Sequence, residues 1–136
     1  MQLKTHLALN PRLCGAPREL SEGRAVLELV THEEMLADSR GLVHGGFVFG
    51  LADAAAMSAI NEPTVVLGSA ETRFLAPVRL GETLLATATV THVEGKKHFV
   101  EVAVTRERGG EQEKVMQGTF VCFVPAQHVL TQKGQS

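Results

Sequence analysis

The stretch GLVHGGFVFGLADAAAMSAIN, residues 41–61, decides the fold because almost all of its side chains are apolar or very small. Gly45 and Gly46 are suited to open a helix, and the helix must close before Pro63, since proline disfavours helical geometry in the residue before it. A helix that is hydrophobic nearly all round must be wrapped by other elements. We therefore expect a long central helix with one carboxylate, Asp53, in its middle.

The segments on either side of this helix alternate between apolar and polar residues, which is typical of half-buried strands. RAVLELV, residues 24–30, is one such strand, and four more follow Pro63. The turns between them are signalled by Pro77, Gly81, Gly95, Gly109 and Gly110. Gly118, inside the last strand, indicates a bulge or a close approach. The pattern predicts an α+β fold in which an antiparallel sheet curls around the central helix.

The length of 136 residues fits one globular unit with one core. Residues 1–22 have no steady period, so we expect a surface arm there with room for one helical turn. Residues 127–136 are polar and are expected to form a flexible tail.

Composition excludes several classes of function. The net charge is −2 with both signs interspersed, which gives no electrostatic case for nucleic acid or an anionic membrane as a partner. No apolar run reaches the roughly 20 residues of a membrane span. Cys14 and Cys122 lie far apart, without metal-ligand or disulfide spacing. We expect no metal site, no disulfide and a reducing cytoplasm as the location.

Asp53 is the first candidate catalytic residue. Its neighbours on the helix offer no partner, and burying an unpaired carboxylate costs several kcal/mol, roughly. The bland alternative is an Asp53 that faces solvent, but this helix has almost no other polar face. A carboxylate that lines a cleft is therefore favoured, with a raised pKa that suits a base or a nucleophile.

The motif His44-Gly45-Gly46 supplies a second candidate site, since open backbone N–H groups and a positive dipole end meet at a helix N-terminus. Such an end can bind a phosphate or polarise a carbonyl, or it is a plain turn. Seven residues separate Gly46 from Asp53, which places them on one side of the helix about 10 Å apart. One carbonyl cannot touch both, whereas an antiparallel second copy could supply the acid. The spacing predicts a dimer with composite sites.

Three segments together carry a resemblance to a known family: GLVHGGFVFGLADAAAMSAI, RFLAPVRLGETLLATATVTHVEGK and QGTFVCFV. They resemble the hotdog-fold acyl-CoA thioesterases, in the branch typified by the phenylacetate-pathway thioesterase, over residues 24–125. The resemblance implies five or six antiparallel strands wrapped around a long helix. It also implies homodimers with a continuous sheet, often paired into homotetramers, and a single hotdog domain over residues 1–136.

The resemblance also implies roles for individual residues. Gly45 would donate its N–H to the thioester carbonyl, and His44 would shape the turn and contact substrate. Asp53 of the other subunit would activate water or attack directly. The implied reaction is hydrolysis of an acyl-CoA to free CoA and a carboxylic acid, with no cofactor, because coenzyme A is part of the substrate.

The substrate-binding residues are expected around the same helix end. Asp38 stands where related enzymes commonly have asparagine, which adds a second acid, and Ser39 beside it is an alternative hydrogen-bond donor. Gly46 is expected to contact the substrate. An acyl pocket for an aryl or medium aliphatic chain is expected from Phe47, Phe49, Met57 and Phe74.

A second resemblance supports a different function. AINEPTVVLGSAETRFLAPVRLGE with GTFVCFV also looks like the acyl-CoA-sensing hotdog modules of bacterial lipid regulators, which bind a thioester without cleaving it. Those modules typically have no carboxylate at the position of Asp53, so its presence favours an enzyme. A dehydratase or isomerase is disfavoured because no Asp/His pairing is evident, and a purely structural module leaves Asp53 unexplained.

Overall fold

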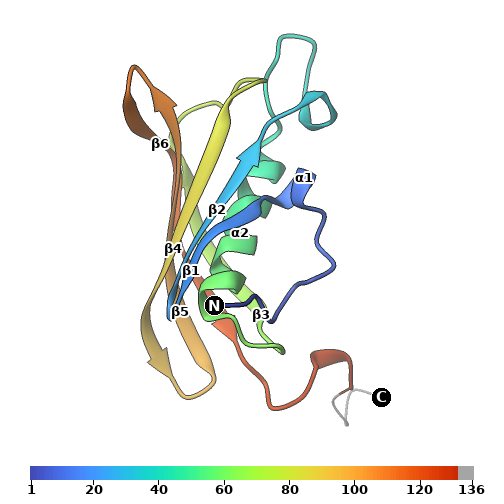
Figure 1. The fold of residues 1–136 in the computed structure, drawn as a ribbon, viewed down its shortest axis with the longest axis vertical. Coiled ribbons are helices and arrows are strands. Elements are labelled where there is room, and N and C mark those ends of the chain that lie inside the picture. Colours follow the sequence, from blue (N-terminus) through green and yellow to red (C-terminus); the bar gives the residue numbers. More distant parts are fainter. Residues whose placement is uncertain (132–136) are drawn as a thin grey trace.

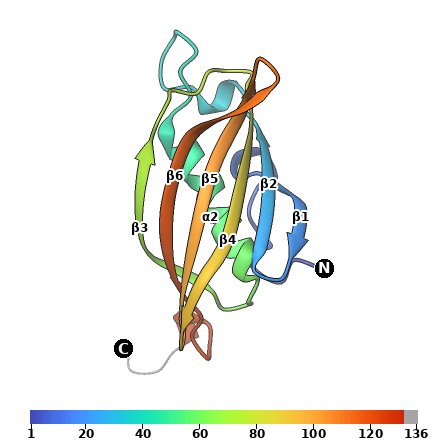
Figure 2. The ribbon, with the colours of Figure 1, turned by 90° about the vertical axis from the view of Figure 1, so that its left-hand side faces the viewer.

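The computed structural model describes residues 1–131 and contains a six-stranded antiparallel sheet that wraps around one long helix (Figure 1). The strand order is β1-β2-β4-β5-β6-β3, so β1 and β3 form the two edges (Figure 2). The predicted α+β hotdog architecture is confirmed. The elements are α1 (Pro11–Cys14), β1 (Ala16–Ser21), β2 (Arg24–Val30), η1 (Glu33–Met35), α2 (Gly45–Ile60), β3 (Val66–Phe74), β4 (Thr83–Glu94), β5 (Lys97–Arg108), β6 (Glu111–Phe123) and η2 (Val129–Thr131).

Helix α2 begins and ends where the sequence predicts. It starts at Gly45, and Asn61 closes it in the left-handed conformation at φ 52°, where its N–H donates to the carbonyl of Met57. Nine of its sixteen residues are buried, among them Leu51 and Met57. The helix packs mainly on β4, β2 and β5, as a nearly all-apolar helix requires.

The core lies between α2 and the inner face of the sheet. Alternate residues of β2, β4, β5 and β6 point into it, since successive side chains of a strand face opposite ways. The strand residues in the core include Ala25, Leu27, Leu29, Leu84, Ala86, Ala88, Val100, Val102, Val104, Met116, Phe120 and Cys122. The inward faces predicted from the alternation are therefore confirmed.

Residues 1–22 differ from the predicted surface arm in their second half. The one helical turn is present as α1, but residues 16–21 form the edge strand β1, paired with β2. Five of the six residues of β1 are exposed. A strand with no buried face shows no apolar alternation, and Pro17 further hides it, since proline is tolerated only at such edges.

The first ten residues run along the side of α2 that faces away from the sheet (Figure 1). Asn61 fixes them at the C-terminal end of the helix, because its side chain accepts from the N–H of Lys4 at 2.7 Å and donates to the carbonyl of Gln2 at 2.8 Å. Thr5 is buried there. This segment therefore covers part of the helix instead of projecting into solvent.

The C-terminal end bears on two further predictions. Within the predicted tail, residues 129–131 form the short 3-10 turn η2, and residues 132–136 lie outside the described part of the chain. None of the helices in residues 1–131 is long and apolar enough to cross a membrane.

Candidate active site at the N-terminus of the central helix

The first turn of α2 presents two backbone donors. His44 is the extended N-cap residue, at φ −64° and ψ 130°, without a side-chain cap. The N–H of Phe47 bonds back to the carbonyl of His44 at 3.1 Å. The N–H groups of Gly45 and Gly46 precede this bond and have no place in the helical ladder. They stand at the positive end of the helix dipole and can receive a developing oxyanion.

The imidazole ring of His44 lies over Gly46, the second glycine of the motif. A Cβ on Gly46 would lie 2.9 Å from Nε2 of His44, so the imidazole ring folds back over the first turn only because Gly46 has no side chain. The ring of Phe47 meets His44 edge-on, with centroids 6.1 Å apart. Three residues predicted from the sequence thus gather at the helix N-terminus. His44 is exposed and free to contact a ligand.

An apolar hollow of about 330 Å³ opens beside Gly45. The ring of Phe74, at the end of β3, lies 3.6 Å from the position of a Cβ on Gly45 and is 54% exposed. No charged side chain of residues 1–131 lines the hollow. Its lining residues are Leu42, Val43, Gly45, Val48, Phe74, Leu75, Ala76, Pro77 and Val78.

The structure does not gather all four residues that were expected to form the acyl pocket. Phe74 lines the hollow, but Phe49 packs on Phe120 with ring centroids 5.5 Å apart, and Met57 is fully buried in the core. Phe47 lies beside His44 and outside the hollow. Sequence reasoning missed the lining from the connection after β3, residues 75–78, because an irregular segment has no period that shows which side chains point inward.

Asp38 and Ser39 lie in the loop before α2. One carboxylate oxygen of Asp38 accepts from the N–H of Arg40 at 2.9 Å and from that of Leu42 at 3.2 Å. This is the local turn typical of aspartate. Ser39 is exposed, and neither residue lines the hollow. Asp38 thus shapes the loop that carries Leu42 to the hollow.

Asp53 occupies the predicted kind of environment. Its side chain is partly buried, and its Oδ1 atom is fully buried without a hydrogen-bond partner in the described chain. Burial raises the pKa of Asp53, and the electrostatic influence of His6 acts in the opposite direction. A carboxyl group with a raised pKa is better suited to accept a proton near neutral pH than an exposed one.

Two thiols share this environment, from elements far apart in the chain. Burial raises the pKa of Cys122, on β6, to about 12, and the charge of Asp53 adds to the effect. The same two causes raise the pKa of Cys14, on α1. Both thiols are therefore inert as nucleophiles at neutral pH. No sequence signal joins His6, Cys14 and Cys122 to Asp53, because only the fold brings them together.

One chain does not bring the acid and the donors together. Asp53 is absent from the lining of the hollow, and it follows Gly46 by about two helical turns, or about 10 Å. Another hollow, of about 940 Å³, lies on the outer face of the sheet and includes none of the predicted site residues. The smaller hollow is the candidate site, because it contains Gly45 and has an apolar lining.

The architecture of one long helix wrapped by a six-stranded antiparallel sheet defines a hotdog-fold protein. A sequence model of the thioesterase superfamily matches residues 40–113, just over half of the chain. The chain belongs to the thioesterase superfamily, as the resemblance predicted.

Two solved structures illustrate the similarity. The uncharacterized protein PH1136 from Pyrococcus horikoshii has a TM-score of 0.91 and 51% identity, covering 96% of this chain and 97% of that chain. The PaaI protein of the E. coli phenylacetic acid degradation operon has a TM-score of 0.76 and 26% identity, covering 85% of this chain and 83% of that one. The predicted branch of the family is confirmed.

Two relatives are longer proteins. A methylthioribose-1-phosphate isomerase from Aquifex aeolicus is 45% identical over 120 residues, which are 88% of this chain and 25% of that protein. The transcription factor FapR from Caldanaerobacter subterraneus is 26% identical over 104 residues, 76% of this chain and 50% of FapR. The chain spans a quarter of the first and half of the second, so their names describe more than the matched region.

Proposed function

We propose that this chain hydrolyses an acyl-CoA thioester at sites shared between two protomers. The observation that carries the proposal is the buried, unpartnered Oδ1 of Asp53 on the helix whose N-terminus borders the apolar hollow. Membership of the thioesterase superfamily supports the same chemistry. A carboxylate kept at a cost to the core is explained by a reaction that uses it.

In the proposed reaction, Gly45 polarises the thioester carbonyl and Asp53 activates water. The thioester carbonyl oxygen accepts from the N–H of Gly45, and the acyl group enters the hollow. Asp53 takes a proton from water while the water oxygen adds to the carbonyl carbon, and the bond to sulfur then breaks. The leaving thiolate recovers a proton, which yields free CoA and a carboxylic acid. Direct attack by Asp53, with later hydrolysis of the mixed anhydride, has the same overall balance.

The distance between Asp53 and Gly45 along one helix supports a site shared with a second protomer. An antiparallel copy of α2 places its own Asp53 beside the first protomer's Gly45. The free edge of β3 ends at Phe74, next to the hollow, so pairing of two β3 strands would join the sheets there. Three apolar side chains at the rim, Leu42, Phe74 and Leu75, are 40% or more exposed and suit a covered surface.

The lining of the hollow favours an uncharged acyl group. An acyl chain with a carboxylate would be desolvated there without a counter-charge, at a high cost. We therefore propose aliphatic or aryl acyl-CoA substrates. A reducing cytoplasm is the proposed location, which agrees with the free thiols of Cys14 and Cys122.

The competing function is a sensor that binds an acyl-CoA without cleaving it. The match to the transcription factor FapR favours it. Asp53 favours the enzyme, because binding alone gives no reason to bury a carboxylate oxygen without a partner.

Release of free thiol from a panel of acyl-CoA substrates tests the proposal. We expect wild-type turnover on at least one substrate, with Asp53→Asn slower by a factor of about 10² or more. Gly45→Pro removes the donor and should cost about 10²–10³ in rate. Proline suits the first helical position, and His44 already has the extended ψ of 130° that a residue before proline needs.

Gly45→Ala is the matched control, because it keeps the N–H and adds a Cβ at an ordinary 3.6 Å from Phe74. It should retain most of the activity. Tight acyl-CoA binding by the wild type without any thiol release would establish the sensor instead.

A further inference from the structure

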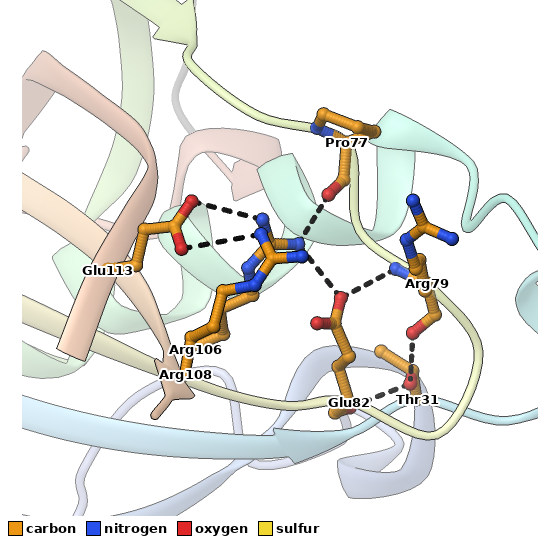
Figure 3. A network of polar contacts seen from close by, with 7 residues as sticks. All are labelled: Thr31, Pro77, Arg79, Glu82, Arg106, Arg108 and Glu113. Carbon is orange, nitrogen blue, oxygen red and sulfur yellow. Dashed lines mark hydrogen bonds and ion pairs between the residues drawn. The ribbon is translucent and has the colours of Figure 1, made fainter. Parts of the chain in front are cut away.

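Arg106 is a buried cation outside the proposed site. It lies near the end of β5 on the inner face of the sheet and is 3% exposed. Its guanidinium donates to the carbonyl of Pro77, to Glu82 at 3.0 Å and to Glu113 at 3.1 Å (Figure 3). A buried charge is costly unless it is paired in this way, so these contacts hold the group in one orientation.

The contacts reach the segment that forms one wall of the hollow. Residues 75–82 connect β3 to β4 at the end of the sheet where α2 begins (Figure 1). Ala76, Pro77 and Val78 line the hollow, and the Arg106 guanidinium binds this wall at the carbonyl of Pro77. Glu82, at the end of the segment, also accepts from the N–H of Arg79 at 2.7 Å. Arg106 therefore ties the middle and the end of the segment to β5.

Backbone hydrogen bonds on either side of Pro77 also hold this wall. The N–H of Leu75 donates to the carbonyl of Val115 at 2.7 Å, and the N–H of Val43 donates to the carbonyl of Val78 at 2.9 Å. The first fixes the wall to β6, and the second joins it to the loop before Gly45. The Pro77 carbonyl lies between these two backbone hydrogen bonds and accepts from the Arg106 side chain.

The stability of the fold alone does not explain the buried ion pairs of Arg106. Well-packed apolar residues often replace a buried ion pair without loss of stability. The Nε of Arg106 is also buried without a partner among residues 1–131, which is a further cost. A guanidinium offers what an apolar side chain does not, namely directed bonds to a carbonyl and two carboxylates at once.

We propose that Arg106 is a positioning residue that sets the depth of the acyl hollow, and with it the acyl-chain preference of the protein. The proposal rests on the proposed function in taking the hollow as the acyl site. Arg106 acts through the Pro77 wall and touches no reacting atom.

The structure offers a matched control on the same strand. Arg108 also approaches Glu113, at 3.5 Å (Figure 3), but its side chain is 60% exposed and makes no hydrogen bond or ion pair with Pro77 or Glu82 in the described chain. Arg108→Met removes the same charge from the cluster without releasing the wall. Arg106→Met removes the contact, and Arg106→Lys keeps the charge but loses the forked geometry.

The test compares kcat and KM for saturated acyl-CoA substrates from two to twelve carbons. In Arg106→Met, we expect discrimination between the preferred chain and the chain two carbons longer to fall about tenfold, mainly through KM. Arg106→Lys should lie between this variant and the wild type, and Arg108→Met should keep the wild-type profile. An unchanged profile in Arg106→Met and Arg106→Lys would overturn the proposal, as would an equal shift in Arg108→Met.

Binding of the same acyl-CoA series by calorimetry separates this proposal from the proposed function. If the wild type cleaves no substrate, hydrolysis is refuted, and the chain-length profile of binding then decides the role of Arg106 by the same criteria. If Arg106→Met does not fold, the comparison of Arg106→Lys with Arg108→Met decides it.

Discussion

The buried carboxylate of Asp53 lowers the free energy of unfolding at neutral pH. Its carboxylate is partly desolvated, and one of its oxygens has no hydrogen-bond partner in residues 1–131. Residues of this kind are common in active sites, where stability is given up for reactivity. The electrostatic influence of His6 lowers the pKa of Asp53, but burial is the larger influence and raises it.

Asp53→Asn should therefore stabilise the protein while it slows hydrolysis by a factor of about 10² or more. The folded-state pKa is raised above its ordinary value of 3.8, so ionisation of Asp53 weakens the fold as pH rises from 3.8 through the raised pKa. At pH 7 we expect the variant to gain about 1 kcal/mol in free energy of unfolding. The gain should shrink towards pH 3, where Asp53 is protonated in both states. Denaturant unfolding at several pH values measures this difference between the variant and the wild type. A difference that is smaller at pH 7 than at pH 3 would contradict the raised pKa of Asp53.

At the residue scale, the sequence singled out the groups of the proposed site but not the residues that surround them. Asp53 and the glycines stand out because a charge in an apolar helix and a double glycine at its start are local anomalies. The proximity of His6 and Cys14 to Asp53 could not be predicted, since it depends on how the first fourteen residues cross the helix, and that of Cys122 depends on how β6 packs against α2. Phe49 and Met57 look like pocket residues in the sequence, but an aromatic or methionine side chain on such a helix fills the core equally well.

At Gly118, the backbone of β6 lies very close to that of β3. A Cβ on Gly118 would lie 2.5 Å from the backbone carbonyl oxygen of Glu71 and 3.0 Å from the Cα of Thr72. The sequence-based prediction of a bulge or a close approach at Gly118 is thus confirmed as a close approach. Backbone atoms cannot rotate away as a side chain can, so the strands would have to separate.

Gly118→Ala should destabilise the protein by about 1–3 kcal/mol, the usual cost of overpacking. Denaturant unfolding measures the change. Gln117→Ala, at the preceding residue, removes atoms and adds none, so it should cost less than about 1 kcal/mol. Equal stability of the two variants would show that β3 does not approach Gly118 as described.

Cross-strand charge also adds a pH dependence to the β5–β6 pair. The hydrogen bond from Arg106 holds the pKa of Glu113 below its ordinary value of 4.5. A lowered folded-state pKa stabilises the fold at pH values above 4.5, and the contribution disappears as pH falls through the lowered value. Glu113→Gln should therefore lose stability relative to wild type at pH 7 and approach it at low pH. Thermal unfolding of the variant and the wild type from pH 7 to pH 3 measures this difference in stability. A difference that does not change with pH would contradict the Arg106–Glu113 pairing.

At the element scale, the sequence predicted α2 and five of the six strands. Elements with one buried face have a period that can be seen in the sequence, and these all pack on the core. Strand β1 escaped prediction because it forms an exposed edge and gains its stability from pairing with β2. The wall of the hollow was not predicted either, because residues 75–82 are held by tertiary contacts, among them those with Arg106, Val115 and Gly41.

At the scale of the whole molecule, one chain forms the fold but keeps the groups of the proposed site apart. A single chain has a packed core and a finished sheet, whereas its acid and its backbone donors lie about 10 Å apart along one helix. We expect the protein in solution to have two or four times the mass of one chain. Light scattering coupled to size-exclusion chromatography measures this mass, and a stable monomer that still cleaves acyl-CoA would refute the shared site.

Complementation between two inactive variants tests the shared site most directly. Asp53→Asn and Gly45→Pro are co-expressed with different affinity tags, and the mixed dimer is isolated by both tags. If each site takes Asp53 from one protomer and Gly45 from the other, the mixed dimer has one intact site and should show about half of the wild-type activity per dimer. Activity no greater than that of the two parent variants would contradict the composite site.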